Sequence, residues 1–468
     1  MSSVSALDSL LSGNSSSTIN LSQILEAALG ASSEGIDVNA AVSAAVTAAE
    51  APEQTWESQE STLQSQASAL NQLQTAATNL DNDMLSLNNL VGPLSATTVT
   101  TSNSSLVTAT AASGTATGDH LVEVSNLATT ASWTSGTFAS SSTALPAGSF
   151  TITTGSGSSA TITTDGTESL SDVASQINGD KLGVSASVIT DATGSRLAIV
   201  ANTSGSAANF TVSTGSSGYG FTQPITGTNA SLTVDGITIS SASNTVTGII
   251  PGLTLNLLSA DPGVYVSLGV SADTAQAAAA INQFVSDYNT VIQAVNAQFT
   301  DSGSGEGVLA TDPNLRNLQD DLQSALSYLN TPSSGTTTVS NLSSLGITTN
   351  SDGTLTVDTA TLNDALSNNF SDVQNFFQGT ALNGFANSLD QQLTNFISPS
   401  DGAFTVDLQS ISTQESGLQT DITNFQTNVI TPLQANLKSE YSQAEILLQQ
   451  LPTELKQIDQ ELGFNGSS

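Results

Sequence analysis

Cysteine is absent from the 468-residue chain, which excludes a disulfide framework and a cysteine nucleophile. Lysine and arginine number only 5 against 40 aspartate and glutamate residues, so the formal net charge is −35. This balance excludes a general nucleic-acid binder, because phosphates are neutralised by Lys and Arg. It also disfavours binding to an anionic membrane surface. Aromatic residues make up only 4% of the chain, so its apolar cores must be light in aromatic side chains.

Groups that could support catalysis or hold a metal are scarce as well. The single histidine, His120, is expected to be structural. The Gly-rich stretch 303–307 lacks the Gly-Lys-Ser/Thr ending of a phosphate-binding loop. The Asp-Gly at 352–353 fits a hairpin turn better than a calcium loop, and the Asp-Asn-Asp at 81–83 is expected on a solvated helix face. We therefore expect no enzyme activity, no cofactor and no metal site.

The sequence gives no indication of a membrane-spanning segment or a cleaved secretory signal. No apolar run is long enough to span a bilayer. The first residues have neither the basic region nor the apolar run of a cleaved secretory signal, so we expect none. Residues 1–34 are rich in Ser, Asn and small side chains, a composition that predicts a disordered tail.

A seven-residue repeat of apolar residues is the strongest pattern in the first hundred residues. One row consists of Leu63, Leu70, Ala77, Met84 and Val91, and a second row of Leu73, Leu80 and Leu87. This is the a/d pattern of a helix that buries a narrow stripe against another helix. The Gly-Pro at 92–93 is expected to end the helix.

The carboxy-terminal region carries a matching pattern. Its rows are Leu437, Ala444, Leu451 and Ile458, and Tyr441, Leu448, Leu455 and Leu462. The register of the apolar repeat slips by one residue between Val429 and Ile430, which predicts a break or kink in the helix there. We expect the two terminal patterns to pair with each other and to form an assembly seam. The alternative is a set of amphipathic core helices in one globular domain.

The middle of the chain has the two-residue alternation of β-strands. Ser169-Leu170-Ser171-Asp172 is a capping-box pattern and opens a short helix, after which two alternating segments flank a turn at 191–194. Asp235-Gly236 joins two further alternating segments as a tight hairpin. A third hairpin is expected between Ile347 and Val357.

These patterns predict an α+β multidomain fold, with a terminal coiled-coil or helical-bundle stalk and inserted β-rich domains. The expected parts are a disordered tail (1–34), terminal coiled-coil helices (35–62 and 430–468), a helical stalk domain (63–100 and 273–429), one β-rich domain (101–150 and 229–272) and a second (151–228).

Several stretches resemble the flagellar hook-associated protein 2 family. They are Gly35-Ile-Asp-Val with Ala48-Ala-Glu-Ala-Pro, Leu232-Thr-Val-Asp-Gly-Ile-Thr-Ile, Ser243-Asn-Thr-Val-Thr-Gly-Ile-Ile-Pro-Gly-Leu-Thr-Leu-Asn-Leu, Phe284-Val-Ser-Asp-Tyr-Asn-Thr-Val-Ile, and Leu345-Gly-Ile-Thr with Asp352-Gly-Thr-Leu. The unit from Ser169 to Val212 resembles the repeat of flagellins and hook-associated proteins. Unlike the family, this chain has almost no basic residues near Pro52 or along the terminal helices.

The resemblance implies an oligomeric cap at the tip of the bacterial flagellum, outside the cell, which promotes the folding and polymerisation of exported flagellin. The implied partners are further copies of the chain in a ring, flagellin, the hook–filament junction proteins and an export chaperone of the flagellar secretion apparatus. The alternative function is a cell-surface adhesin whose Ser/Thr-rich β-domains bind a carbohydrate or a host protein.

Overall fold

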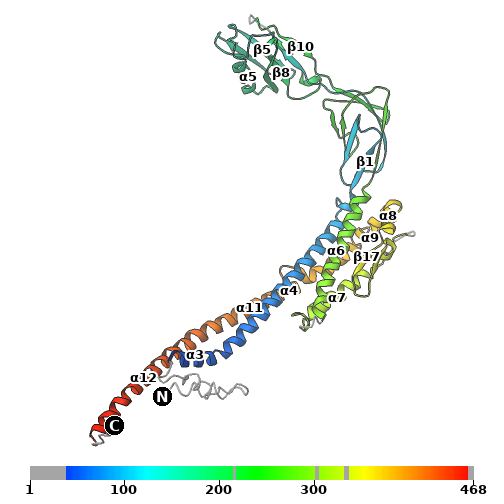
Figure 1. Ribbon diagram of the computed structural model, residues 1–468. Helices are drawn as coiled ribbons and strands as arrows, with labels where there is room; N and C mark the ends of the chain where they lie inside the picture. The colour runs from blue at the N-terminus through cyan, green and yellow to red at the C-terminus, as the bar shows by residue number, and fades with distance from the viewer. Residues whose placement is uncertain (1–37, 214–217, 301–304, 331–336, 462–468) are drawn as a thin grey trace.

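The computed structural model describes residues 38–213, 218–300, 305–330 and 337–461. The molecule is elongated: a helical rod leads into a helical domain, and two β-rich domains follow at the opposite end (Figure 1). The predicted α+β multidomain architecture is therefore confirmed. Within the described residues, no helix combines the length and apolarity needed to cross a bilayer. The expected tail at 1–34 lies outside the described residues.

The rod and the helical domain are built from segments at the two ends of the chain. They are α3 (Val38–Ala49), α4 (Ala51–Asn88), the 3-10 turn η1 (Pro93–Ser95), α6 (Thr274–Phe299), α7 (Pro313–Leu326), η3 (Leu342–Leu345), the hairpin β16 (Ile347–Thr349) and β17 (Leu355–Val357), α8 (Thr359–Asn368), α9 (Phe370–Gln378), α10 (Phe385–Ile397), α11 (Ala403–Phe425), the π-helical turn η4 (Gln426–Ile430) and α12 (Thr431–Glu461).

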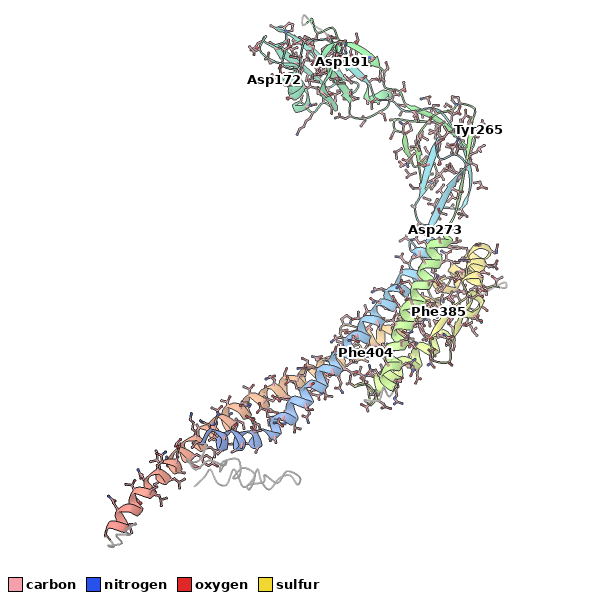
Figure 2. All side chains as sticks on the ribbon, viewed as in Figure 1. Asp172, Asp191, Tyr265, Asp273, Phe385 and Phe404 are labelled. Atoms are coloured by element: carbon pink, nitrogen blue, oxygen red, sulfur yellow. The ribbon has the colours of Figure 1, made fainter. Side chains whose placement is uncertain are left out.

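The helical domain has one apolar core, to which the second half of α4 contributes. Leu80 and Met84 of α4 are fully buried there with Phe284 of α6. Phe385 of α10 contacts the rings of Phe284 and Phe376, and Phe404 of α11 lies against Phe396. Figure 2 labels Phe385 and Phe404 within the helical domain. Burial of these side chains supplies most of the driving force that holds the domain together.

The inner β-rich domain continues directly from α4 and returns into α6. Its five-stranded antiparallel sheet has the order β1 (Thr97–Thr101), β15 (Tyr265–Ala272), β3 (Gly118–Asn126), β11 (Ala230–Val234) and β12 (Ile237–Ser241). A three-stranded sheet of β13 (Thr245–Thr247), β14 (Leu253–Leu257) and β2 (Val107–Ala111) contributes to the same core. Asp273 joins the two domains: its amide donates to the Ala96 carbonyl, and its carboxylate caps α6 by accepting from Gln276 N.

The outer β-rich domain packs α5 (Leu170–Gly179) against two small sheets. One sheet has the order β10 (Thr222–Ile225), β4 (Ser132–Thr134), β8 (Gly194–Ala201) and β7 (Val184–Asp191). The other has the order β6 (Ser159–Thr164), β5 (Gly148–Thr154) and β9 (Phe210–Ser213). The capping box predicted at Ser169 and Asp172 is present, and the hairpins at 191–194, 235–236 and 347–357 are also confirmed.

The border between the two β-rich domains differs from the expected position at residue 150. Ala128 still packs in the inner core, whereas Ala131 and Leu145 pack in the outer core. The expected border would also divide β5, which pairs with β6 and β9 of the outer domain. The structure therefore places the border near residue 130, because Ser132–Thr134 pairs with β8 rather than with an inner strand.

Candidate assembly surfaces

The predicted amino-terminal seam lies on α4 and is almost wholly buried. Its members Leu70, Leu73, Ala77, Leu80, Met84 and Leu87 are all in the core of the helical domain, and Leu63 is half-buried at its edge. Val91, also placed in the row, lies beyond the helix and is exposed. The side chains of this seam pack against α6, α10 and α11.

The expected pairing of this seam with the carboxy-terminal rows was wrong within the chain. Leu437 and Tyr441 of α12 instead join a separate small cluster with Val42 and Val46 of α3 and Ile430 of η4. The seam finds nearer apolar partners, such as Phe284 and Leu389, on helices α6 and α10. A seven-residue row shows that a helix face is buried, but it does not specify which helix covers that face. In the sequence, the four-residue spacing of Val42 and Val46 gives α3 an apolar face, and this face is the one that contacts α12.

Polar and aromatic contacts join α4 to α11 and η4 along the rod. The ring of Trp56 meets the ring of Phe425 edge to face, with 5.5 Å between centroids. Nearby, Gln426 Nε2 donates a hydrogen bond to the buried carboxylate of Glu53. Further along, Gln74 Nε2 donates to Thr405 Oγ1 at 3.2 Å. The two ends of the chain therefore run together in the rod.

The register slip predicted at Val429–Ile430 corresponds to η4. This turn inserts a π-helical segment between α11 and α12 without ending the helical path, and it buries Ile430 against α3. Pro452 lies within α12 and does not interrupt it, because the helix continues through this position to Glu461.

Beyond α3, the apolar face of α12 has no cover within the described chain. Ala444 is half-buried, but Leu448, Leu451 and Ile458 are each 46–49% exposed. Ile446 and Leu447 are more exposed still, and they stand outside the predicted rows. Leu455 lies in α12, but its side chain is outside the described set. The helix projects at one end of the molecule, beyond α3 (Figure 1).

Asp81 and Asp83 do not form the solvated helix face that their sequence suggested. Both carboxyls are half-buried, Asp81 next to Asp390 of α10 and Asp83 next to Asp287 of α6. Burial, reinforced by the neighbouring carboxyl, raises the pKa of each to about 7.

Other polar features show local structural roles. His120 Nδ1 lies 2.8 Å from Asp235 Oδ2, and the second oxygen of Asp235 accepts from Leu121 N, so both contacts hold the β11–β12 turn against β3. That turn needs positive φ at Asp235 and Gly236, as the Asp-Gly sequence permits. A hollow of about 500 Å³ between α4 and α11 is lined by polar residues such as Glu60 and Gln419. Among the described residues, no group of three or more potential metal ligands occurs.

Comparisons with known proteins agree with the resemblance. The protein-family model described as flagellar hook-associated protein 2 N-terminus matches residues 34–131. The family model described as flagellar hook-associated protein 2 C-terminus matches residues 227–453. The flagellin hook IN motif matches residues 149–203, within the outer β-rich domain.

Individual proteins give the same result. The chain is 35% identical over 158 residues to the B-type flagellar hook-associated protein 2 of Pseudomonas aeruginosa, a match that spans 32% of each chain. It is 28% identical over 407 residues to the flagellar hook-associated protein 2 of Escherichia coli, covering 80% of this chain and 85% of the relative. The crystal structure of the flagellar cap protein FliD D1-D2-D3 domains from Escherichia coli superimposes with a TM-score of 0.59 at 28% identity, covering 74% of this chain and 99% of that one. Because the two ends of the chain match the two terminal models of one family, and its three-domain body has the fold of a cap protein, the chain belongs to the flagellar hook-associated protein 2 family.

Proposed function

We propose that this protein is a structural subunit of the filament cap at the distal end of the bacterial flagellum, outside the cell. Several copies would associate side by side, and the cap would help exported flagellin to fold and polymerise. The family membership and the likeness to a cap protein structure support this role. The proposal requires no catalytic step and no cofactor.

The observation that carries the proposal is the uncovered apolar face of α12 at the end of a rod made from both ends of the chain. Leu448 and Leu451 are about half exposed, although each would gain stability from burial against another helix, roughly 1.5–3 kcal/mol for a fully buried side chain. Other subunits could supply this cover. The seven-residue spacing of the row suits a helix–helix contact with such a neighbour.

The β-rich domains lie at the far end of the molecule from α12 (Figure 1), where they could contact flagellin. The same proposal includes the hook–filament junction proteins and an export chaperone as partners, and delivery by the flagellar secretion apparatus. The alternative role as a cell-surface adhesin has no support in the family matches.

The test removes apolar surface from α12 without touching the folded core. A strain lacking the protein is complemented with Leu448→Ser/Leu451→Ser, and motility and unpolymerised flagellin in the medium are measured. We expect lost motility and leaked flagellin. The purified variant should keep its helical circular dichroism, because both positions are exposed. It should sediment as a monomer where the wild type forms larger species.

A matched control separates the apolar contact from helix propensity. Gln449 and Gln450 are exposed on the same helix, so Gln449→Ser/Gln450→Ser introduces the same two serines into α12 without loss of apolar surface. This control should behave as the wild type. The charge of −35 opposes close approach of subunits, so added salt should strengthen wild-type association by screening. Normal filaments with the leucine variant, or wild-type protein that stays monomeric at high concentration in both low and high salt, would contradict the proposal.

A further inference from the structure

Two pairs of carboxyl groups bridge the helices of the helical domain. On one side of α4, Asp81 is within hydrogen-bonding reach of Asp390 of α10. Two residues along, Asp83 makes the same kind of contact with Asp287 of α6. Asp390 and Asp287 are the only charged residues on their helices. The only charges that α6 and α10 carry are therefore placed opposite like charges of α4.

No cation lies among the helices that pack against α4. Their charged residues, with those of α4 itself, are all acidic: Glu53, Glu57, Glu60, Asp81 and Asp83 on α4, Asp287 on α6, Asp372 on α9, Asp390 on α10, and Asp407, Glu415 and Asp421 on α11. Helix α3 has none. Arg316 is on α7, which packs on α10 and α6, and its guanidinium lies over the Phe299 ring. Among the described residues, no ion pair forms in this domain.

The positions of the two α4 carboxyls make full ionisation costly. Oδ1 of Asp81 and Oδ2 of Asp83 are inaccessible to solvent and receive no hydrogen bond from an ordinary donor in the described chain. Leu80 and Met84, fully buried, are their neighbours along the helix. Two ionised carboxylates are both acceptors and repel each other, whereas one proton shared between them supplies a donor and removes one charge. On the α6 side, Gln283 Nε2 also donates to Asp287, at 3.0 Å.

We propose that each pair holds one proton in the folded protein, so that helices α6 and α10 are fastened to α4 by carboxyl–carboxylate hydrogen bonds and the helical domain loosens when these protons are lost. The device is a pH-sensitive clamp within the fold. It does not depend on the proposed cap function.

The direction of the pH dependence follows from the shifted groups. Burial and the neighbouring carboxyl raise the pKa of Asp81 and of Asp83 from an unfolded value of 3.8 to about 7. Between these values the folded chain binds more protons than the unfolded chain, so stability falls as pH rises. The stability that the protonated pairs contribute to the folded chain is fully present below about pH 4 and is lost by about pH 7. Tyr288, the other titratable group of α6, is fully buried, and burial raises its pKa further, so it stays neutral over this range.

The test is urea unfolding of the full chain, followed by the far-ultraviolet circular dichroism of its helices, between about pH 5 and about pH 8. Because each pKa unit corresponds to a tenfold change in an equilibrium constant, we expect the unfolding constant of the wild type to rise by about tenfold or more over this range. The variant Asp81→Asn/Asp83→Asn keeps the shape of the side chains but cannot ionise. It should lose most of that pH dependence and be more stable than the wild type at the alkaline end.

The matched control is Asp364→Asn, which removes an exposed carboxylate from α8 of the same domain and should leave the wild-type slope unchanged. A second measurement follows the side-chain carboxyl carbons by nuclear magnetic resonance in protein labelled at aspartate. Two carboxyls, absent from the double variant, should titrate near neutrality. Equal pH slopes in the wild type and the double variant, or carboxyls that are all ionised at about pH 5, would overturn the proposal. Loss of the wild-type stability on addition of EDTA would also overturn it, by showing that a metal ion joins the pairs.

Discussion

The indole of Trp56 meets the ring of Phe425 edge to face, with centroids 5.5 Å apart and planes at 86°. This contact joins the start of α4 to the end of α11, and so it ties the two ends of the chain together in the rod. Edge-to-face packing places the positive ring edge against the negative ring face, which is the favoured geometry for aromatic pairs.

A double-mutant cycle at this contact should reveal direct coupling. With Trp56→Leu, Phe425→Leu and the double variant, we expect a coupling free energy of about 0.5–1.5 kcal/mol in urea unfolding. Phe404 provides the matched comparison, because it packs against Phe396 inside the helical domain. A cycle between Trp56 and Phe404 should give a value near zero. Equal couplings in the two cycles would show that the Trp56–Phe425 contact has no special contribution.

A charged side chain at the buried position of Leu80 is expected to destabilise the helical domain strongly. Leu80 is fully buried, so Leu80→Asp would place an unpaired carboxylate among apolar side chains and should cost several kcal/mol. We expect the helical domain to unfold, while the β-rich domains, which have separate cores, still melt cooperatively. In a bacterial strain that carries only this variant, flagellin should be secreted but not polymerised. Leu85→Asp, at a position of the same helix that is 51% exposed, should have little effect. Normal filaments with Leu80→Asp would contradict the expectation.

The side chain of Gln378 is expected to stabilise the carboxy-terminal end of α4. Its buried side-chain amide donates to the carbonyls of Leu87 and Asn89, each at 3.1 Å. The Asn89 carbonyl also accepts from Gly92 N, whereas the Leu87 carbonyl is an acceptor that the helix leaves free at its end. Gln378→Leu removes the donor and should lower the free energy of unfolding by about 1–3 kcal/mol. Gln374→Leu, which loses only a half-exposed bond to Ser95, is the control and should cost less. Equal losses for both variants would contradict this role.

The outer β-rich domain should have the opposite pH response to the helical domain. The hydroxyl and amide of Thr193, and then Arg196, lower the pKa of Asp191 from 3.8 to about 2. A lowered pKa contributes stability that is present above about pH 4 and lost as the pH falls toward about 2. We therefore expect acid to destabilise this domain, as measured by Trp133 fluorescence in a Trp56→Phe background. Asp191→Asn should reduce the loss, whereas Asp180→Asn, at the exposed end of α5, should not. An unchanged acid response in Asp191→Asn would contradict the assignment.

The sequence by itself determined the elements whose hydrogen bonds are local. Ser169 and Asp172 close a capping box across three residues, and the Asp-Gly turn at 235–236 permits the backbone that its hairpin needs. The apolar face of α4 and the register slip near Ile430 were also readable, because helical periodicity records which side of a helix is buried. The stretches that resemble the family were also readable from the sequence, because each of them is contiguous in the chain.

Only the tertiary structure decided which surfaces meet. Leu80 packs with α6 and α10 rather than with α12, and Tyr441 packs with α3. Residues 131–150 join the outer rather than the inner β-rich domain. Asp81 meets Asp390 across a helix interface, a contact between residues far apart in the sequence that no local pattern indicates. The physical reason is that apolar burial is non-directional, so a stripe specifies that it will be covered but not by what, and the environment of a charge exists only once the helices around it have packed.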